Sequence, residues 1–116
     1  MIKIGKKRVY LACGATDMRK SIDGLTALVE HSFKLDIFDD AIFVFCNRGR
    51  DRLKILEWDG DGFWLHFKRL EKGRFPWPRR EERRTMELRT EELEQLLNGT
   101  KLVRKMKGEE ISRAVI

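Results

Sequence analysis

The sequence has 116 residues, of which 41% are hydrophobic and 38% are charged, and its formal net charge is +6. This length fits one domain with one small core, which excludes a catalytic fold built from two domains. Aromatic residues make up 9% of the chain, which excludes disorder throughout, because disordered chains bury little apolar surface. The excess of basic residues favours a polyanion such as nucleic acid as a partner.

In chain order, the first predicted elements are a strand over residues 9–12 and an amphipathic helix. The helix is expected to begin at Thr16 or Asp17, both good N-cap types, and to run to about residue 34. A continuous apolar run over residues 41–46 then predicts a central strand covered on both faces. The apolar face of the helix is carried by Met18, Ile22, Leu25 and Val29, at spacings of three and four.

Residues 52–58 and 63–70 predict two further strands, and the Asp59-Gly60 step between them favours a hairpin. The length of the loop decides which side chains share a face, because a slip of one residue turns a strand over. A two-residue turn would put Arg52 and Lys54 on one face with the apolar set Phe63, Leu65 and Phe67.

A three-residue loop would instead group that apolar set with Leu53 and Ile55. Charged and apolar side chains are then better separated, so this loop is the preferred prediction, although Asp-Gly favours the shorter turn. The opposite face would carry Arg52, Lys54, Trp58, Trp64, His66 and Lys68.

Beyond the hairpin, the prolines within residues 73–78 end the sheet, and residues 86–88 predict one more edge strand. Thr90 is expected to cap a short helix over residues 91–98. The predicted fold class is α+β: a small single domain over residues 1–100, with an antiparallel β-meander, the N-terminal helix packed on one face and a short C-terminal helix. Residues 101–116 are interpreted as a basic C-terminal tail.

Basic residues cluster where the chain enters and leaves the predicted hairpin, so folding is expected to bring them together at the end away from the turn. Such a patch suits phosphates, and Trp64 could stack on bases unless another element covers it. A rim of solvated charges is the alternative interpretation. The predicted nucleic-acid-binding residues are Arg48, Arg50, Arg52, Lys54, Trp64, Lys68, Arg69 and Arg74.

The aromatic–proline segment over residues 73–78 gives a different hypothesis, a protein-interaction module with Phe75 and Trp77 as anchors. Trp77 is also a candidate for stacking on bases. No catalytic motif is present, so no enzyme activity, cofactor, metal or small-molecule substrate is expected. The many aspartates alone motivate a weaker third hypothesis, a metal-dependent nuclease. Cys13 and Cys46 form no metal or disulfide pattern, and no apolar run could span a membrane, which favours the cytoplasm.

The sequence holds two long motifs: VYLACGATDMRK followed by DGL, and RLKILEWDGDGFWL followed by KRLEKGRFPWP. Together they resemble a bacterial family, the accessory protein, often called TnpB, that insertion sequence 66 elements encode in their second open reading frame. The resemblance spans roughly residues 8–98. It implies a non-catalytic accessory factor for transposition, encoded beside a separate transposase that carries the catalytic residues. The expected partners are DNA, in particular the element ends, and that transposase, with docking on the transposase without DNA contact as the alternative.

Overall fold

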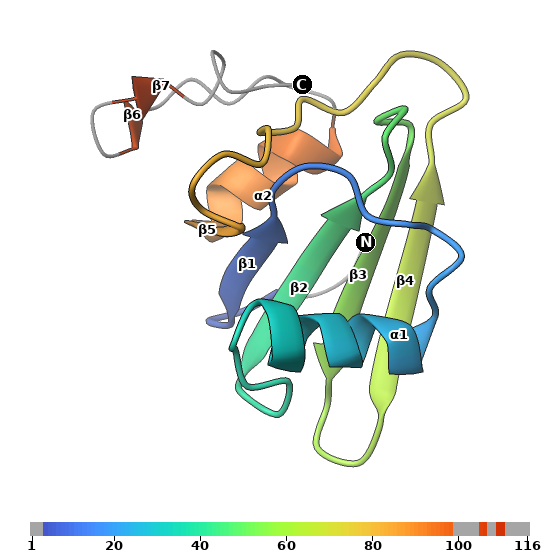
Figure 1. The fold of residues 1–116 in the computed structure, drawn as a ribbon, viewed down its shortest axis with the longest axis vertical. Helices are drawn as coiled ribbons and strands as arrows, with labels where there is room; N and C mark the ends of the chain where they lie inside the picture. Colours follow the sequence, from blue (N-terminus) through green and yellow to red (C-terminus); the bar gives the residue numbers. More distant parts are fainter. Residues whose placement is uncertain (1–3, 99–104, 107–108, 111–116) are drawn as a thin grey trace.

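The computed structural model describes residues 4–98, 105–106 and 109–110, and a five-stranded sheet forms its centre (Figure 1). Neighbouring strands follow the order β4-β3-β2-β1-β5, so β2 is central and β4 and β5 are the edges. The strands are β1 (Arg8–Ala12), β2 (Ala41–Cys46), β3 (Arg52–Trp58), β4 (Phe63–Arg69) and β5 (Thr85–Leu88).

The sheet is mixed. β2, β3 and β4 form an antiparallel meander, and β5 runs antiparallel to β1. β1 and β2, however, are parallel neighbours, so the chain crosses between them through the helical segment. The expected α+β class is confirmed, whereas a purely antiparallel sheet is not what forms, because a helix lies between the first two strands.

Two apolar layers cover the two faces of the sheet. The helical segment α1 (Ile22–Ala27) and η1 (Leu28–Ser32) packs Leu25 and Val29 against Phe43 and Phe45 of β2. Helix α2 (Thr90–Leu97) covers the other face, where it packs against Ile42, Val44 and Cys46 of β2. Every residue of β2 is buried, which confirms the prediction of a central strand covered on both faces.

The first helix begins later than predicted, at Ile22 rather than after Thr16 or Asp17. The backbone before it bonds to other parts of the fold: Thr16 N donates to Cys46 O at 2.8 Å, and Lys54 Nζ donates to Met18 O and Lys20 O, both at 2.8 Å. These bonds tie the segment to β2 and β3 in a non-helical path, so the first helical turn forms only after it. The helical segment continues as the π-helix η1 to Ser32 with Phe33 as its C-cap, close to the predicted end near residue 34.

The loop between β3 and β4 has four residues, so the preferred three-residue loop was wrong. Trp58 pairs with Phe63 and Leu56 with Leu65. This register restores the face assignment of the shorter turn, because the two loops differ by an even number of residues. Arg52 and Lys54 therefore share a face with Phe67, and the charge is tolerated because it lies at the rim of that face.

Phe75 and Trp77 are completely buried, so the expectation that they serve as surface anchors is wrong. Both lie in the layer between the sheet and α2. Trp77 Nε1 donates to Ala12 O at 2.9 Å, which satisfies the one polar group of the indole. The prolines around them end the sheet as expected, but the aromatic rings turn inward and complete the core.

The C-terminal elements follow the prediction closely. The edge strand β5 covers the predicted residues 86–88, and α2 coincides with the predicted helix to within a residue. Its N-cap is Arg89, not Thr90, and Glu92 Oε1 accepts from Arg89 N at 2.7 Å. Most of the tail expected over residues 101–116 lies outside the described residues; the part described is β6 (Lys105–Met106) paired with β7 (Glu109–Glu110).

The burial of Trp77 gives a prediction about stability. Replacing Trp77 with Ala is expected to lower the free energy of unfolding by about 3–5 kcal/mol, because it leaves a large cavity and an unpaired carbonyl. Urea unfolding followed by circular dichroism measures this. The matched control is Trp64→Ala, at a side chain that is 57% exposed, which should change stability by no more than about 0.5 kcal/mol. Equal losses in the two variants would contradict the packing described.

Candidate nucleic-acid interface

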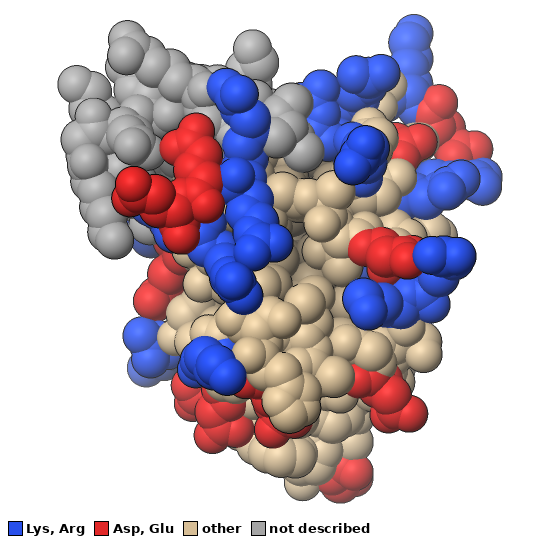
Figure 2. Space-filling view, in the orientation of Figure 1, with Lys and Arg blue, Asp and Glu red and all other residues tan. Residues whose placement is uncertain are grey.

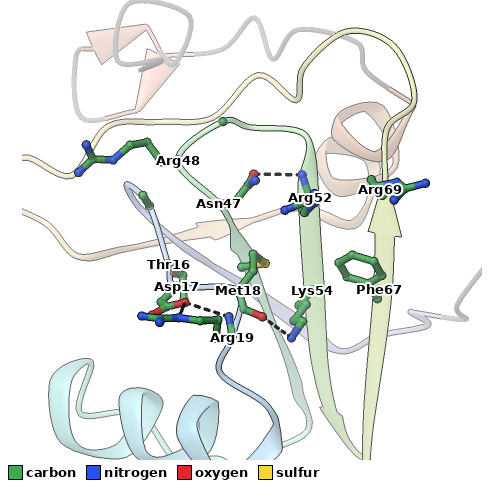
Figure 3. Close-up of a pocket in the computed structure, with 12 residues that line it drawn as sticks. Thr16, Asp17, Met18, Arg19, Asn47, Arg48, Arg52, Lys54, Phe67 and Arg69 are labelled. Atoms are coloured by element: carbon green, nitrogen blue, oxygen red, sulfur yellow. Dashed lines mark hydrogen bonds and ion pairs between the residues drawn. The ribbon is translucent and has the colours of Figure 1, made fainter.

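A groove of about 1010 Å³ opens at the end of the sheet where β1 and β2 finish, where β3 starts and where β4 ends. It lies on the face that carries α1 (Figure 3). Five basic side chains line it, together with the acidic Asp17 and the aromatic Phe67. The basic residues are Arg19, Arg48, Arg52, Lys54 and Arg69.

A rigid turn between β2 and β3 forms one wall of the groove. The Asn47 side chain holds it: Oδ1 accepts from the backbone N of Asp51 and of Arg52, each at 3.0 Å, and Nδ2 donates to Asp51 Oδ1 at 2.7 Å. The hydrogen bond from Asn47 lowers the pKa of Asp51, with smaller contributions from Arg52 and Arg74. Arg48 projects from this turn, so its position is set by the backbone geometry (Figure 3).

The segment between β1 and α1 forms the opposite wall. Lys54 reaches across from β3 and fixes it through the carbonyls of Met18 and Lys20. Asp17 and Arg19 form an ion pair, with Arg19 Nη2 at 2.7 Å from Asp17 Oδ2, and Arg19 N also donates to Asp17 Oδ1. The Arg19 side chain bonds the carboxylate and lowers the pKa of Asp17 to about 2.

Positive charge in the groove is only partly balanced. Asp17 pairs with Arg19, and Glu71 pairs with Arg69 at 2.8 Å. Arg48 and Arg52 have no acidic group within ion-pair distance among the described residues, so their guanidinium groups are available to an anion. Figure 2 shows basic side chains predominating over the upper half of this face and acidic ones around its lower end.

Four of the eight predicted nucleic-acid-binding residues meet in the groove. In Figure 3, Arg52 and Arg69 lie side by side because they are paired across β3 and β4. Arg50 and Arg74 are not among the lining residues, although Arg50 belongs to the Asn47 turn and its carbonyl accepts from Phe75 N at 2.6 Å. The four that line the groove are Arg48, Arg52, Lys54 and Arg69.

Trp64 and Lys68 are on the opposite face of the sheet, so the prediction of one shared patch was wrong for them. Both are paired with residues of β3 that face α2, Trp64 with Glu57 and Lys68 with Leu53. Lys68 Nζ donates to Leu97 O at 2.8 Å, at the end of α2. Trp64 Nε1 donates to Asp59 Oδ2 at 2.5 Å, and its ring stacks on His66.

Phe67 is the groove residue that sequence reasoning missed. The preferred register assigned it to the buried face, yet its side chain is 57% exposed and lies beside Lys54. The two-residue turn that the Asp-Gly step favours would have placed Phe67 on one face with Arg52 and Lys54. The Asp-Gly step was therefore the sequence feature that could have identified Phe67 as a groove residue. Arg19 also lines the groove, because the helix predicted to begin at Thr16 or Asp17 begins only at Ile22 and leaves Arg19 in the segment before it.

Reactive groups elsewhere are few in the described part of the chain. Burial raises the pKa of Cys13 to about 11 and that of Cys46 to about 12, so both remain thiols at neutral pH. No cluster of three or more His, Cys, Asp or Glu side chains with metal-binding geometry occurs among the described residues. None of the described helices has the length and apolarity that crossing a membrane requires.

Comparison with known proteins places this fold in a family. Residues 7–107 match the family described as IS66 Orf2 like protein. Two proteins of Sinorhizobium fredii are similar: "Uncharacterized protein y4hO", 44% identical over 71 residues, or 61% of this chain and 62% of that protein; and "Uncharacterized protein y4jC", 39% identical over 71 residues, or 61% of each. The match thus spans about three fifths of these relatives. No solved structure matches the chain.

The ion pair in the groove predicts the titration of Asp17. A carboxyl with a pKa lowered to about 2 is still ionised at pH 4, so the pair with Arg19 should persist there and be lost only as the pH falls through about 2. Carbon-detected NMR of the carboxyl groups measures this. In Arg19→Ala the Asp17 pKa should rise toward the usual aspartate range, and an unchanged titration would contradict the pairing.

Proposed function

The chain belongs to the IS66 Orf2-like family, and from this premise we propose that it is a non-catalytic accessory factor for transposition of an insertion sequence. In this proposal it acts in the cytoplasm and binds DNA, in particular the ends of the element, through the basic groove. A separate transposase performs the chemistry. The observation that carries the proposal is the pair Arg48 and Arg52, which face the groove without acidic partners among the described residues.

Guanidinium groups suit this role because they donate in a planar fork that matches two phosphate oxygens. Arg48 and Arg52 come from the two ends of one turn, and Arg69 follows on the adjacent strand (Figure 3). A row of cations of this kind can follow a phosphate backbone and release its counterions. Phe67 adds an exposed ring on which an unpaired base could stack.

The position of the groove in the fold supports the same conclusion. Loops that follow parallel strands gather at the carboxyl ends of those strands, where open α/β sheets commonly bind ligands. β1 and β2 are the parallel pair here, and the segments that follow them contribute Arg19 and Arg48. Because the central strand β2 is buried over its whole length, the core does not depend on the side chains of Arg48 and Arg52.

Docking on the transposase without DNA contact is the second candidate, and a different surface favours it. Phe38 is 55% exposed and packs edge-on against Trp58 at 5.0 Å between ring centroids, with Phe63 at 6.0 Å. This aromatic cluster is at the turn end of the β3–β4 hairpin, away from the groove. Exposed aromatic rings are typical anchors of protein interfaces. If this candidate is correct, Phe38→Ala should abolish co-purification with the transposase.

The proposed DNA contact predicts a salt-dependent loss of affinity in groove variants. Replacing Arg48 and Arg52 together with Ala should weaken binding to an element-end duplex at least about tenfold. The slope of log affinity against log salt should fall by about two, because each arginine that contacts a phosphate contributes about one unit. Fluorescence anisotropy at several salt concentrations, with an element-end duplex and a scrambled duplex, measures both quantities.

The matched control is Arg8→Ala, which removes one positive charge at the start of β1, at the opposite end of the sheet from the groove. Arg8 is paired with Glu87 at 3.2 Å, so the control should leave affinity and salt slope nearly unchanged. Absent or salt-independent binding of the native protein to both duplexes would remove the DNA proposal. Retained affinity in the double variant would remove the groove as the site.

A further inference from the structure

Strand β4 is an edge strand whose outer side pairs with no described element. Three large hydrophobic side chains are exposed in the described part of the chain, and two of them are on β4: Trp64 and Phe67, both 57% exposed. They are on opposite faces of the strand, because they are an odd number of residues apart. An edge of this kind is a template for pairing with another strand.

The backbone groups that β4 offers can be identified from its bonds to β3. Asp59 N donates to Gly62 O at 3.0 Å, and Leu70 N donates to Asp51 O at 2.7 Å, so the even-numbered positions are the hydrogen-bonded ones. The alternation of an antiparallel pair then directs the amides and carbonyls of the odd-numbered positions away from β3. These outward positions are Phe63, Leu65, Phe67 and Arg69.

We propose that two copies of this chain pair antiparallel through β4, in a register centred on His66, and join their sheets into one. In that register the full strands overlap, and Phe63 of one copy bonds Arg69 of the second copy through the outward backbone groups. Leu65 and Phe67 pair in the same way. Each outward amide and carbonyl thus finds a partner, which other registers achieve only for a shorter overlap.

The side chains are compatible with this register. Trp64 comes opposite Lys68 of the second copy, whose aliphatic stem can pack on the indole ring while its ammonium group keeps the bond to Leu97 O. Leu65 comes opposite Phe67, an apolar pair of the kind that stabilises neighbouring strands. The two copies of Phe67 would then each lose part of their exposed surface, which supplies an apolar contribution besides the backbone bonds.

Charge complementarity singles out a second copy as the partner. The β3–β4 hairpin carries Asp59 and Asp61 at its turn, whereas Lys68 and Arg69 lie at the other end of β4. Antiparallel pairing places the acidic turn of each copy beside the other copy's Arg69 and Lys72, an end that stays net positive although Glu71 there lies opposite Asp61 and pairs with Arg69. The Asp59 carboxyl raises the pKa of Asp61, first through a side-chain hydrogen bond and then through charge repulsion, and a neighbouring cation would offset the repulsion.

The assembly has a geometric consequence for the groove. The two-fold axis of an antiparallel edge pair is perpendicular to the sheet, so both copies present the α1 face on the same side. The two grooves then open on one surface, with the Arg69 positions roughly 20 Å apart along the strands, since six residues separate Phe63 from Arg69. The pairing itself does not depend on DNA binding, so it can be tested on the free protein.

Cysteine cross-linking tests the register directly. In a two-fold pair centred on His66, its α-carbon is about 4.5 Å from that of the second copy, within the range that a disulfide spans. The full chain with His66→Cys should therefore form a covalent dimer under mild oxidation. The native Cys13 and Cys46 are buried and should not contribute. The matched control is Glu87→Cys on the other edge strand, β5, which should remain monomeric on a non-reducing gel.

A second variant covers the possibility that His66→Cys disturbs folding, since His66 is 3.3 Å from Glu57. The double variant Trp64→Cys with Lys68→Cys should give the same covalent dimer, because these positions face each other in the register. Failure of both to cross-link, or equal cross-linking of Glu87→Cys, would overturn the proposal.

Charge reversal gives an independent prediction. Asp61→Lys should shift the protein from dimer toward monomer, because it places a cation at the turn beside Arg69 and Lys72 of the second copy. Glu71 of that copy lies directly opposite position 61, so the dissociation constant should rise only roughly fivefold. The matched control Glu30→Lys changes the net charge equally on η1, away from the edge, and should keep the native dimer. Light scattering coupled to gel filtration at moderate salt measures the mass. A native monomer at all concentrations, or equal effects of both reversals, would overturn the proposal.

Discussion

The register between β3 and β4 is the constraint on which the functional surfaces depend. A four-residue loop pairs Trp58 with Phe63, and every later pair along the hairpin follows from that one. As a result Lys54 and Phe67 share one face with Arg52 and Arg69, whereas Trp64 shares the other with Glu57. A shift of one residue would bury Phe67 and split the cations of the groove between two faces.

Burial of β2 on both faces makes this distribution possible. An apolar layer covers each face of the sheet. The polar side chains at the end of the sheet where the loops meet are therefore not needed to form the core. The parallel pairing of β1 and β2 then brings the segments that follow both strands to one end. Lys54 and Asn47 hold these segments through hydrogen bonds to backbone groups, so the cations of the groove project from a fixed frame.

Charge is distributed unevenly along the β3–β4 hairpin. The turn carries carboxylates, and the opposite end, where the strands join the rest of the chain, carries mostly cations. Both proposals use this asymmetry. The basic end attracts a polyanion, and the two ends together make β4 complementary to a second copy of itself. Lys68 illustrates the double role of such residues: its ammonium group bonds Leu97 O at the end of α2, while its strand position faces Trp64 in the proposed pair.

The sequence by itself determined the elements of this protein: the run over residues 41–46, the hairpin strands and the helix at residues 91–98 all carry local patterns, and the motifs identified the family. Four of the eight candidate residues meet in one groove, as the predicted hairpin implied, because they lie in or next to strand ends that come together. Only the tertiary structure decided the start of the first helix, since Lys54 Nζ donates to the carbonyls of Met18 and Lys20 in the segment before it. It also decided the faces of Trp64 and Phe67 and the burial of Trp77. Loop length and long-range bonds set these features, and neither is encoded in the periodicity of a single segment.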